Sequence, residues 1–331
     1  MKRMLIAACC CLAVGAVAIA EAKPPTSNEG FTGGAAVTPD GKMKTADVSR
    51  DGNTLLVYRH ATVPVPEPLK GKKYAEPRSD YLHPLCSPDG ICLTRDFPND
   101  HPHHRGVYWA WPEVYYKGQK RDLHALQGVF ARPVEASAGT AGSSLGVRLE
   151  IEAENVWKWN DDEKIVIENA KIRVPVTRGK GYFVDFEFSF RALVDGVSIA
   201  RRGQRAYGGL NLRTNLMGDQ KIIEHTDPND AKVRRSYAQI SGVPDGGKKH
   251  AAIAIFQHAD NPRYPGDWVK FPHIAWLQPT FPASGEKYPL SKDKPLILRY
   301  RYWVQSGPGA TKEQLARAWD DYNKKPAKEK P

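Results

Sequence analysis

The sequence predicts an all-β fold: a large antiparallel β-sandwich, supersandwich-like in size, that ends in one short C-terminal helix. Short runs of β-branched and aromatic residues alternate with Gly, Pro, Asn and Asp along most of the chain. Several runs alternate apolar and polar residues with period two, which is typical of antiparallel sheets with one buried face. The chain has 331 residues, a length that all-β architectures reach around a single core.

Two segments at the N-terminus are expected to lie outside the sandwich. Residues 1–22 combine a basic start, an apolar run and the small-x-small motif Ala20-Glu21-Ala22. These are the parts of a secretory signal peptide, so we expect cleavage after Ala22 and a periplasmic or secreted protein. A membrane anchor is the alternative, but the run is short and no later segment is apolar enough to span a bilayer. Residues 23–41, rich in Pro, Gly, Ser and Thr, predict a flexible leader.

A single sandwich domain is expected over residues 42–323, because no Pro/Gly/Ser-rich linker divides the middle of the chain. The runs that predict its strands are 54–60, 81–86, 91–95, 107–116, 128–136, 145–154, 165–176, 182–192, 208–213, 236–240, 251–257, 274–278 and 296–304. Thr311 and Gln314 form a capping box, and Leu315, Trp319 and Tyr322 share one helical face. Residues 324–331, rich in Lys and Pro, predict a disordered tail.

Cleavage of the signal peptide would leave Cys86 and Cys92 as the remaining cysteines. They flank Pro88-Asp89-Gly90, which predicts a type I turn with Gly in the bulge position. Such a turn places the two cysteines opposite each other on adjacent strands. Since exported compartments are oxidising, we expect a cross-strand disulfide. Two free thiols that fill the core are the alternative.

The chain carries a formal net charge of +11. Its positive residues are scattered along the predicted strands rather than gathered in one stripe, which argues against a nucleic-acid partner. A basic exterior suits anionic substrates or the cell envelope, and a solvated surface without a specific partner is the alternative.

The stretch Arg95–Trp111 contains the most concentrated chemistry of the chain. Three histidines, His101, His103 and His104, stand among acidic and basic residues, and the aromatic run Val107-Tyr-Trp-Ala-Trp follows them. Groups that bind protons, metals or anions thus lie beside flat apolar surfaces that can hold a ring. We therefore interpret the rest of the chain as a β-scaffold that presents this stretch.

His103, His104 and His258 are the candidate catalytic residues. Histidine titrates near neutral pH and suits proton transfer, and His258 follows an apolar strand, where binding groups gather. We rank proton transfer or hydrogen bonding to a sugar first, a structural turn second and a metal third. We expect no cofactor; the alternative is a divalent transition metal held by His101, His103 and His258.

Seven further residues are candidates for substrate binding. The arginines offer bidentate forks to carboxylates or vicinal hydroxyls, and the tryptophan offers a ring face. The seven are Arg95, Asp96, His101, Arg105, Trp109, Arg213 and His83. For Arg95 and Arg105 the alternative is internal ion pairing, for Trp109 a place in the core, and for His83 simple burial.

Several blocks of the chain, taken together, resemble the bacterial family named methane oxygenase PmoA. They cover most of the chain after the signal peptide and include Tyr81-Leu-His-Pro-Leu, Leu93-Thr-Arg-Asp-Phe-Pro, Asp100-His-Pro-His-His-Arg-Gly, Trp109-Ala-Trp, Gly208-Gly-Leu-Asn-Leu-Arg and Phe256-Gln-His. Members of that family look like exported proteins of sugar-degrading bacteria, so the resemblance implies a carbohydrate-related role. The enlarged sandwich is likewise similar to that of sugar mutarotases.

These observations predict an exported carbohydrate-active protein, with a sugar or another small polar ligand as its partner. The residues leave three alternatives open: an enzyme with histidine acid–base chemistry, a non-catalytic glycan-binding protein, and a metal-dependent oxidoreductase or hydrolase. The chain has no Gly-x-Ser-x-Gly elbow and no phosphate-binding glycine loop, which argues against a serine nucleophile or a nucleotide. The oligomeric state stays open.

Overall fold

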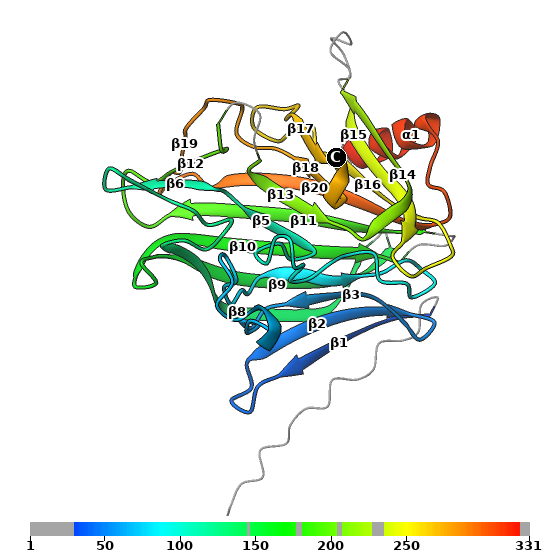
Figure 1. The fold of residues 1–331 in the computed structure, drawn as a ribbon, viewed down its shortest axis with the longest axis horizontal. Helices are drawn as coiled ribbons and strands as arrows, with labels where there is room; N and C mark the ends of the chain where they lie inside the picture. The colour runs from blue at the N-terminus through cyan, green and yellow to red at the C-terminus, as the bar shows by residue number, and fades with distance from the viewer. Residues whose placement is uncertain (1–29, 144–145, 177–180, 204–206, 227–234, 325–331) are drawn as a thin grey trace, which may run out of the picture.

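The fold of the computed structural model is all-β, as the sequence predicts (Figure 1). The structure describes residues 30–143, 146–176, 181–203, 207–226 and 235–324. Within these ranges the chain forms two eight-stranded antiparallel sheets, a four-stranded sheet and one C-terminal α-helix. The predicted signal peptide and most of the predicted tail lie outside the described residues.

The first sheet carries the candidate functional site on one of its faces. Its strands, in spatial order, are β1 (Phe31–Val37), β2 (Met43–Arg50), β3 (Asn53–Arg59), β4 (Tyr81–Leu85), β5 (Val107–Ala110), β13 (Gly209–Arg213), β18 (Trp276–Pro279) and β17 (Trp268–Phe271). Two short 3₁₀ helices interrupt its connections, η1 (Glu67–Leu69) and η2 (Pro272–Ile274).

The second sheet contains the longest strands, and a small third sheet lies beside it. The second sheet runs β14 (Leu216–Thr226), β15 (Ser236–Pro244), β16 (Ala251–Gln257), β20 (Leu296–Ser306), β11 (Gly181–Ala192), β10 (Glu163–Pro175), β9 (Gly146–Trp159) and β8 (Val129–Ser143). The third runs β19 (Tyr288–Pro289), β12 (Ser198–Ala200), β6 (Glu113–Tyr116) and β7 (Gln119–Arg121).

The two large sheets pack face to face around one apolar core. The ring of Trp109 on β5 lies 4.2 Å from that of Phe188 on β11. Across the same interface the Tyr182 hydroxyl donates to the carbonyl oxygens of Leu55, at 2.9 Å, and Cys86, at 2.7 Å. Strand β11 buries every second residue. The apolar residues of its period-two sequence pattern are therefore the ones that face the first sheet.

The helix α1 (Lys312–Asn323) packs on the second sheet, at β15 and β16. The predicted capping box is confirmed: the Thr311 hydroxyl accepts from the Gln314 amide, and the Gln314 side chain accepts from the Thr311 amide. Leu315 and Trp319 are buried, and Trp319 Nε1 donates to the Gln257 carbonyl at 3.0 Å. Among the described residues, no helix has the length and apolarity needed to cross a bilayer.

Three local predictions need correction. The expected flexible leader was wrong for residues 31–37, which form strand β1; a Cβ at Gly33 would lie 3.1 Å from Leu149, so the glycine permits close packing there. The expected strand 107–116 is two strands in different sheets, β5 and β6, separated at Pro112, which has no amide hydrogen to donate. Residues 91–95 form only isolated bridges.

Cys86 and Cys92 do face each other across an antiparallel bridge, as the turn between them predicts. Both are free thiols, so the expected disulfide is wrong for this structure. A hydrogen bond between the two sulfurs lowers the pKa of Cys92 to about 6 and raises that of Cys86. The pair therefore matches the free-thiol alternative.

Candidate functional site

The site is built on the outer face of β5, β13 and β18, which lie side by side in the first sheet. Alternate residues of these strands point inward and belong to the apolar core between the sheets: Val107, Trp109, Leu210, Leu212 and Leu277. The residues between them project from the outer face: Tyr108, Asn211, Arg213, Trp276 and Gln278. These five are also buried, so something covers this face as well.

Two loops cover part of the outer face and, together with residues 72–74, Arg202, Tyr207 and the segment around η2, line a cavity of about 670 Å³. Residues 97–106 are the last part of the connection from β4 to β5, and residues 122–128 connect β7 to β8. The volume falls within the range of ligand pockets, roughly 300–1,000 Å³. Exposed side chains surround the mouth of the cavity: Lys72, Lys73, Asn99, Arg202 and His273. We call this space the histidine cavity.

Three imidazoles meet at the buried end of the histidine cavity. One ring nitrogen each of His103, His104 and His124 lies within 4.8 Å of the other two. The ring centroids are 4.6 Å apart for His103 and His104, 5.2 Å for His103 and His124, and 5.6 Å for His104 and His124. Their exposed fractions are 9%, 4% and 1%. We call these residues the histidine triad.

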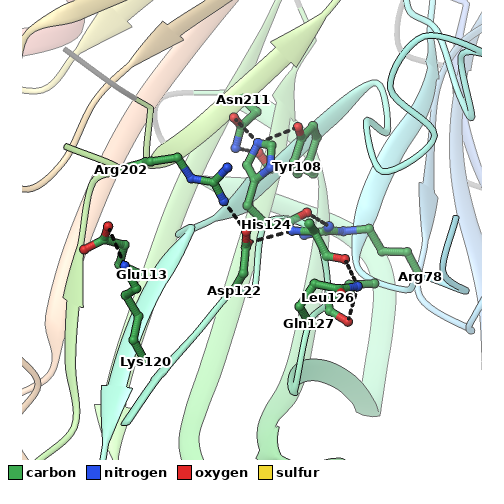
Figure 2. Close-up of polar contacts among 11 residues, drawn as sticks. Arg78, Tyr108, Glu113, Lys120, Asp122, His124, Leu126, Gln127, Arg202 and Asn211 are labelled. Carbon is green, nitrogen blue, oxygen red and sulfur yellow. Dashed lines mark hydrogen bonds and ion pairs between the residues drawn. The ribbon is translucent and has the colours of Figure 1, made fainter. Parts of the chain in front are cut away.

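The outer face of the sheet fixes the orientation of His124 (Figure 2). Its Nε2 lies 2.8 Å from the Tyr108 hydroxyl and 3.2 Å from Oδ1 of Asn211. The amide nitrogen of Asn211 donates to the carbonyls of Tyr108 and Gly209, so the other amide atom is the oxygen. Because that oxygen accepts, Nε2 of His124 carries the hydrogen and Nδ1 holds the lone pair.

The histidine triad is uncharged at neutral pH. Burial, followed by the charge of neighbouring cations, lowers the pKa of His103 to about 3. Burial and the neighbouring histidines lower the pKa of His104 well below its usual value, and burial does the same for His124. Among the described residues, Nδ1 of His103 and Nδ1 of His124 are sealed from solvent without a hydrogen-bond partner. A neutral imidazole carries one N–H and one nitrogen lone pair, so each of the three rings can offer one lone pair to a ligand.

Two carboxylates line the histidine cavity, and each is paired with an arginine. Asp100 accepts from Nη2 of Arg213 at 2.7 and 3.0 Å and lies 3.1 Å from Nδ1 of His101. Burial opposes its charge, but these hydrogen bonds outweigh burial and lower the pKa of Asp100 to about 2. Asp122 accepts from the Ala125 amide at 2.8 Å and from Arg202 (Figure 2), while burial raises its pKa.

Aromatic rings form the remaining wall of the cavity. Trp276 on β18 stacks against Phe271 at 5.1 Å and meets Tyr207 edge-on at 5.6 Å. Tyr207 in turn lies 4.6 Å from His124. On the other side Tyr74 meets His103 at 5.5 Å. Flat apolar surfaces thus stand directly beside the histidine triad.

The structure brings together part of the predicted site. His101, His103 and His104 all line the histidine cavity, and the ring of His101 stacks on that of His104 at 4.7 Å. Arg213 lies behind them with its side chain 3% exposed. It holds Asp100 and approaches Nδ1 of His104 at 3.4 Å, so it positions the site rather than lining it.

The expectation that His258 joins the other histidines was wrong. His258 follows β16 in the second sheet, and its ring lies 5.0 Å from that of Tyr322 on α1. Its Nδ1 accepts from the Asp260 amide at 3.1 Å. The strand end does open into a loop, as the sequence suggests, but the loop packs against helix α1, and His258 does not line the histidine cavity.

Five predicted ligand-binding residues have internal partners instead. Arg105 is fully buried, where it donates to the carbonyls of Pro102 and Glu76 and faces Asp96 at 3.5 Å. Asp96 also accepts from Tyr81, Arg95 pairs with Asp245, and His83 contacts Thr94 at 3.0 Å. Trp109 lies in the core. For Arg95 and Arg105 the ion-pairing alternative is therefore correct.

His124 is the main site residue that the sequence did not reveal. It lies between Leu123 and Ala125 in a short connection, without any other histidine or metal-binding spacing nearby. Such a lone histidine among apolar residues usually fills a core. The one local signal is Asp122, whose carboxylate caps the turn through the Ala125 amide.

The fold and site define a class: an all-β sandwich protein with a histidine-lined cavity on the outer face of one sheet. The chain belongs to DUF6807, a family of unknown function whose profile matches residues 45–320. The match covers the whole second sheet, the first sheet except β1 and the start of β2, both covering loops and most of α1. A search among curated proteins finds no match. The resemblance to the family named methane oxygenase PmoA stays a prediction.

Proposed function

We propose that this protein is a carbohydrate-active enzyme that binds one sugar or similar polar ring in the histidine cavity. The observation that carries the proposal is the composition of that one space. A cavity of about 670 Å³ combines aromatic walls, exposed cations and three neutral imidazoles. Ligand pockets of this kind place a few polar groups among mainly apolar surfaces.

The aromatic wall supports a ring as the ligand. Trp276, Phe271 and Tyr207 offer faces and edges to the C–H surface of a sugar. Lys72 and Lys73 at the mouth, together with the paired Asp100 and Asp122, supply donors and acceptors for hydroxyl groups. The excess of cations at the mouth favours a sugar that carries a carboxylate.

The histidine triad supplies the reactive groups. Because burial keeps His103, His104 and His124 neutral, these residues do not act as acids at neutral pH. They offer nitrogen lone pairs at the buried end of the cavity, beside the ring-binding wall. This differs from the acid–base exchange that the sequence suggested, in which His258 had a part.

Binding and turnover test the proposal. We expect thermal stabilisation and saturable binding by a member of a panel of neutral and acidic mono- and disaccharides, followed by a product detectable by chromatography. Tyr207→Ala removes part of the wall and should weaken binding by at least about tenfold, or 1.4 kcal/mol. Tyr115→Ala, on the third sheet outside the cavity, is the matched control and should bind like the parent.

Two outcomes would replace the proposal. Saturable binding without any product over long incubation would make the protein a glycan-binding protein, the second candidate, for which the aromatic wall alone suffices. No binding by any sugar, or equal losses in Tyr207→Ala and Tyr115→Ala, would remove carbohydrate as the ligand class.

We also propose that the protein is exported. The support is the basic, apolar and small-residue pattern of residues 1–22, which has the form of a secretory signal peptide. N-terminal sequencing of the protein from its native host should start at Lys23. An intact Met1 on the protein in the cytoplasm would contradict this.

A further inference from the structure

One ring nitrogen of each histidine in the triad lies close to those of the other two. The three ring nitrogens come from different segments: His103 and His104 from the loop before β5, and His124 from the loop before β8. Nevertheless they lie within 4.8 Å of one another. Nitrogen ligands that share an ion at about 2.0–2.1 Å lie roughly 3–4 Å apart, so small side-chain rotations bring the three to bonding distance.

The surroundings leave these nitrogens without another use. Nδ1 of His103 and Nδ1 of His124 are buried and have no hydrogen-bond partner in the part of the chain that the structure describes. A buried polar atom without a partner costs roughly 1–3 kcal/mol. The rings that carry these two atoms have centroids 5.2 Å apart in one cavity, which suits a ligand that accepts lone pairs.

Partners behind His124 match those of a metal ligand. A metal-binding imidazole usually donates its other ring N–H to a fixed oxygen, which sets the tautomer. Here Nε2 of His124 faces Oδ1 of Asn211 at 3.2 Å, and Gln278 Nε2 holds the same oxygen at 2.7 Å. Gln278 is itself fixed by the Gly208 amide at 3.0 Å. This chain of amides on the outer face leaves Nδ1 of His124 free.

We propose that His103, His104 and His124 bind a divalent transition metal ion, of the zinc or cobalt type, at the buried end of the histidine cavity. Imidazole nitrogens suit such ions, whereas magnesium and calcium prefer oxygen ligands. Three protein ligands leave a coordination position open toward the cavity, as in catalytic rather than structural sites. The proposal deepens the proposed function, since an oxygen of a bound sugar would reach that position.

His104 is the weakest of the three ligands. Nη1 of Arg213 lies 3.4 Å from its Nδ1. If the metal took Nδ1, the guanidinium would compete for the lone pair. If the metal bound Nε2 of His104 instead, Nδ1 would carry the ring hydrogen, and that hydrogen would face the N–H of Arg213. Asp100 balances the positive charge of Arg213 through two hydrogen bonds. This reduces the repulsion between Arg213 and a metal ion bound to His104.

Metal binding to the full chain, without any sugar, tests the inference separately from the proposed function. Protein stripped with a chelator should bind one equivalent of Zn²⁺ in calorimetry, and Co²⁺ should produce visible ligand-field bands. His124→Ala should lower Zn²⁺ affinity by more than about 100-fold, because losing only a partner behind a ligand costs about 10–100-fold. His103→Ala should act like His124→Ala, and His104→Ala should cost less.

Asn211 positions the ring of His124, and this role is tested by a substitution that restores the lost hydrogen bond. Asn211→Ala should lower Zn²⁺ affinity by about 10–100-fold, and Asn211→Asp, which keeps an acceptor for Nε2 of His124, should restore most of it. His273→Ala is the matched control, since His273 lines the same cavity but is exposed and outside the triad. It should bind like the parent.

Three results would overturn the inference: binding of much less than one equivalent by the parent protein, an affinity unchanged in both His103→Ala and His124→Ala, or an equal loss in His273→Ala. Circular dichroism of each variant separates unfolding from ligand loss. If His124→Ala does not fold, His103→Ala decides the matter, because His103 sits at the cavity surface with its Nδ1 unpartnered.

Discussion

The two faces of β5, β13 and β18 are equally buried but have opposite chemistry. The inner face presents Trp109, Leu210 and Leu212 to the second sheet. There the buried carboxyl group of Glu168 accepts hydrogen bonds from Trp109 and Trp157. The outer face presents amide, phenol and guanidinium groups to the histidine triad, where buried nitrogens lack partners. Unpartnered buried nitrogens that line a cavity are candidates for ligand binding, whereas a hydrogen-bonded buried group such as Glu168 contributes to the core.

The largest expected effect lies on the inner face, in Trp109→Ala. The substitution leaves a cavity against Phe188 and removes the Nε1 donor at 2.6 Å from Glu168. It should lower the free energy of unfolding by about 3–5 kcal/mol, as measured by urea denaturation. Trp109→Phe, which keeps most of the ring, should bind any cavity ligand like the parent. Loss of ligand binding in folded Trp109→Phe would show that packing on the inner face controls binding on the outer face.

Glu168 gives the inner face a pH dependence. Burial, then the nearby Asp80, raises its pKa well above the usual value, so the folded protein keeps a proton that the unfolded chain releases near pH 4.5. Its contribution to stability is full below about pH 4.5 and declines as the pH rises toward the folded pKa. The expected slope is about 1.4 kcal/mol per pH unit.

Glu168→Gln should remove this slope. The amide keeps an oxygen for Trp109 or Trp157 but has no proton to release. Urea denaturation of the parent and the variant at pH 5, 6, 7 and 8 gives the comparison: their difference in unfolding free energy should shift in favour of the variant as the pH rises. A difference independent of pH would mean that Glu168 is ionised in the folded protein.

The inner face was largely predictable from the sequence, and the outer face was not. Alternation in residues 182–192 and 296–304 predicted strands with one apolar face, because burial against a second sheet imposes period two. The same pattern cannot say which polar residues are covered by loops. Asn211 alternates with Leu210 and Leu212, a pattern that fits a solvated face as well, yet it is fully buried behind His124.

The sequence predicted the part of the candidate site that comes from one segment and missed the part that comes from elsewhere in the chain. His101, His103 and His104 are neighbours in sequence, so composition alone brought them together. His124 reaches them only because β5 and β13 are adjacent and the connection after β7 folds back over them. His258 was placed there wrongly, since nothing in residues 251–258 states that β16 belongs to the second sheet. Sheet membership is a long-range property that local spacing does not encode.

A smaller effect is expected on the outer face, in Tyr108→Phe. The phenol lies 2.8 Å from Nε2 of His124, and its removal should cost about 1 kcal/mol of stability. Asn211 still fixes the tautomer of His124, so ligand binding should change little. Tyr302→Phe is the matched control, because its buried hydroxyl has no partner among the described residues. That variant should be at least as stable as the parent in thermal denaturation.

The smallest effect has the opposite sign and separates the two faces most clearly. His103→Leu replaces a buried imidazole whose Nδ1 has no partner with an apolar side chain that needs none. Measured on chelator-treated protein, it should raise the unfolding free energy by about 0.5 kcal/mol, as substitutions that relieve an unsatisfied functional position commonly do. It should also abolish metal binding in the cavity. A loss of stability comparable to that of Trp109→Ala would instead place His103 with the inner face, as a residue kept for packing.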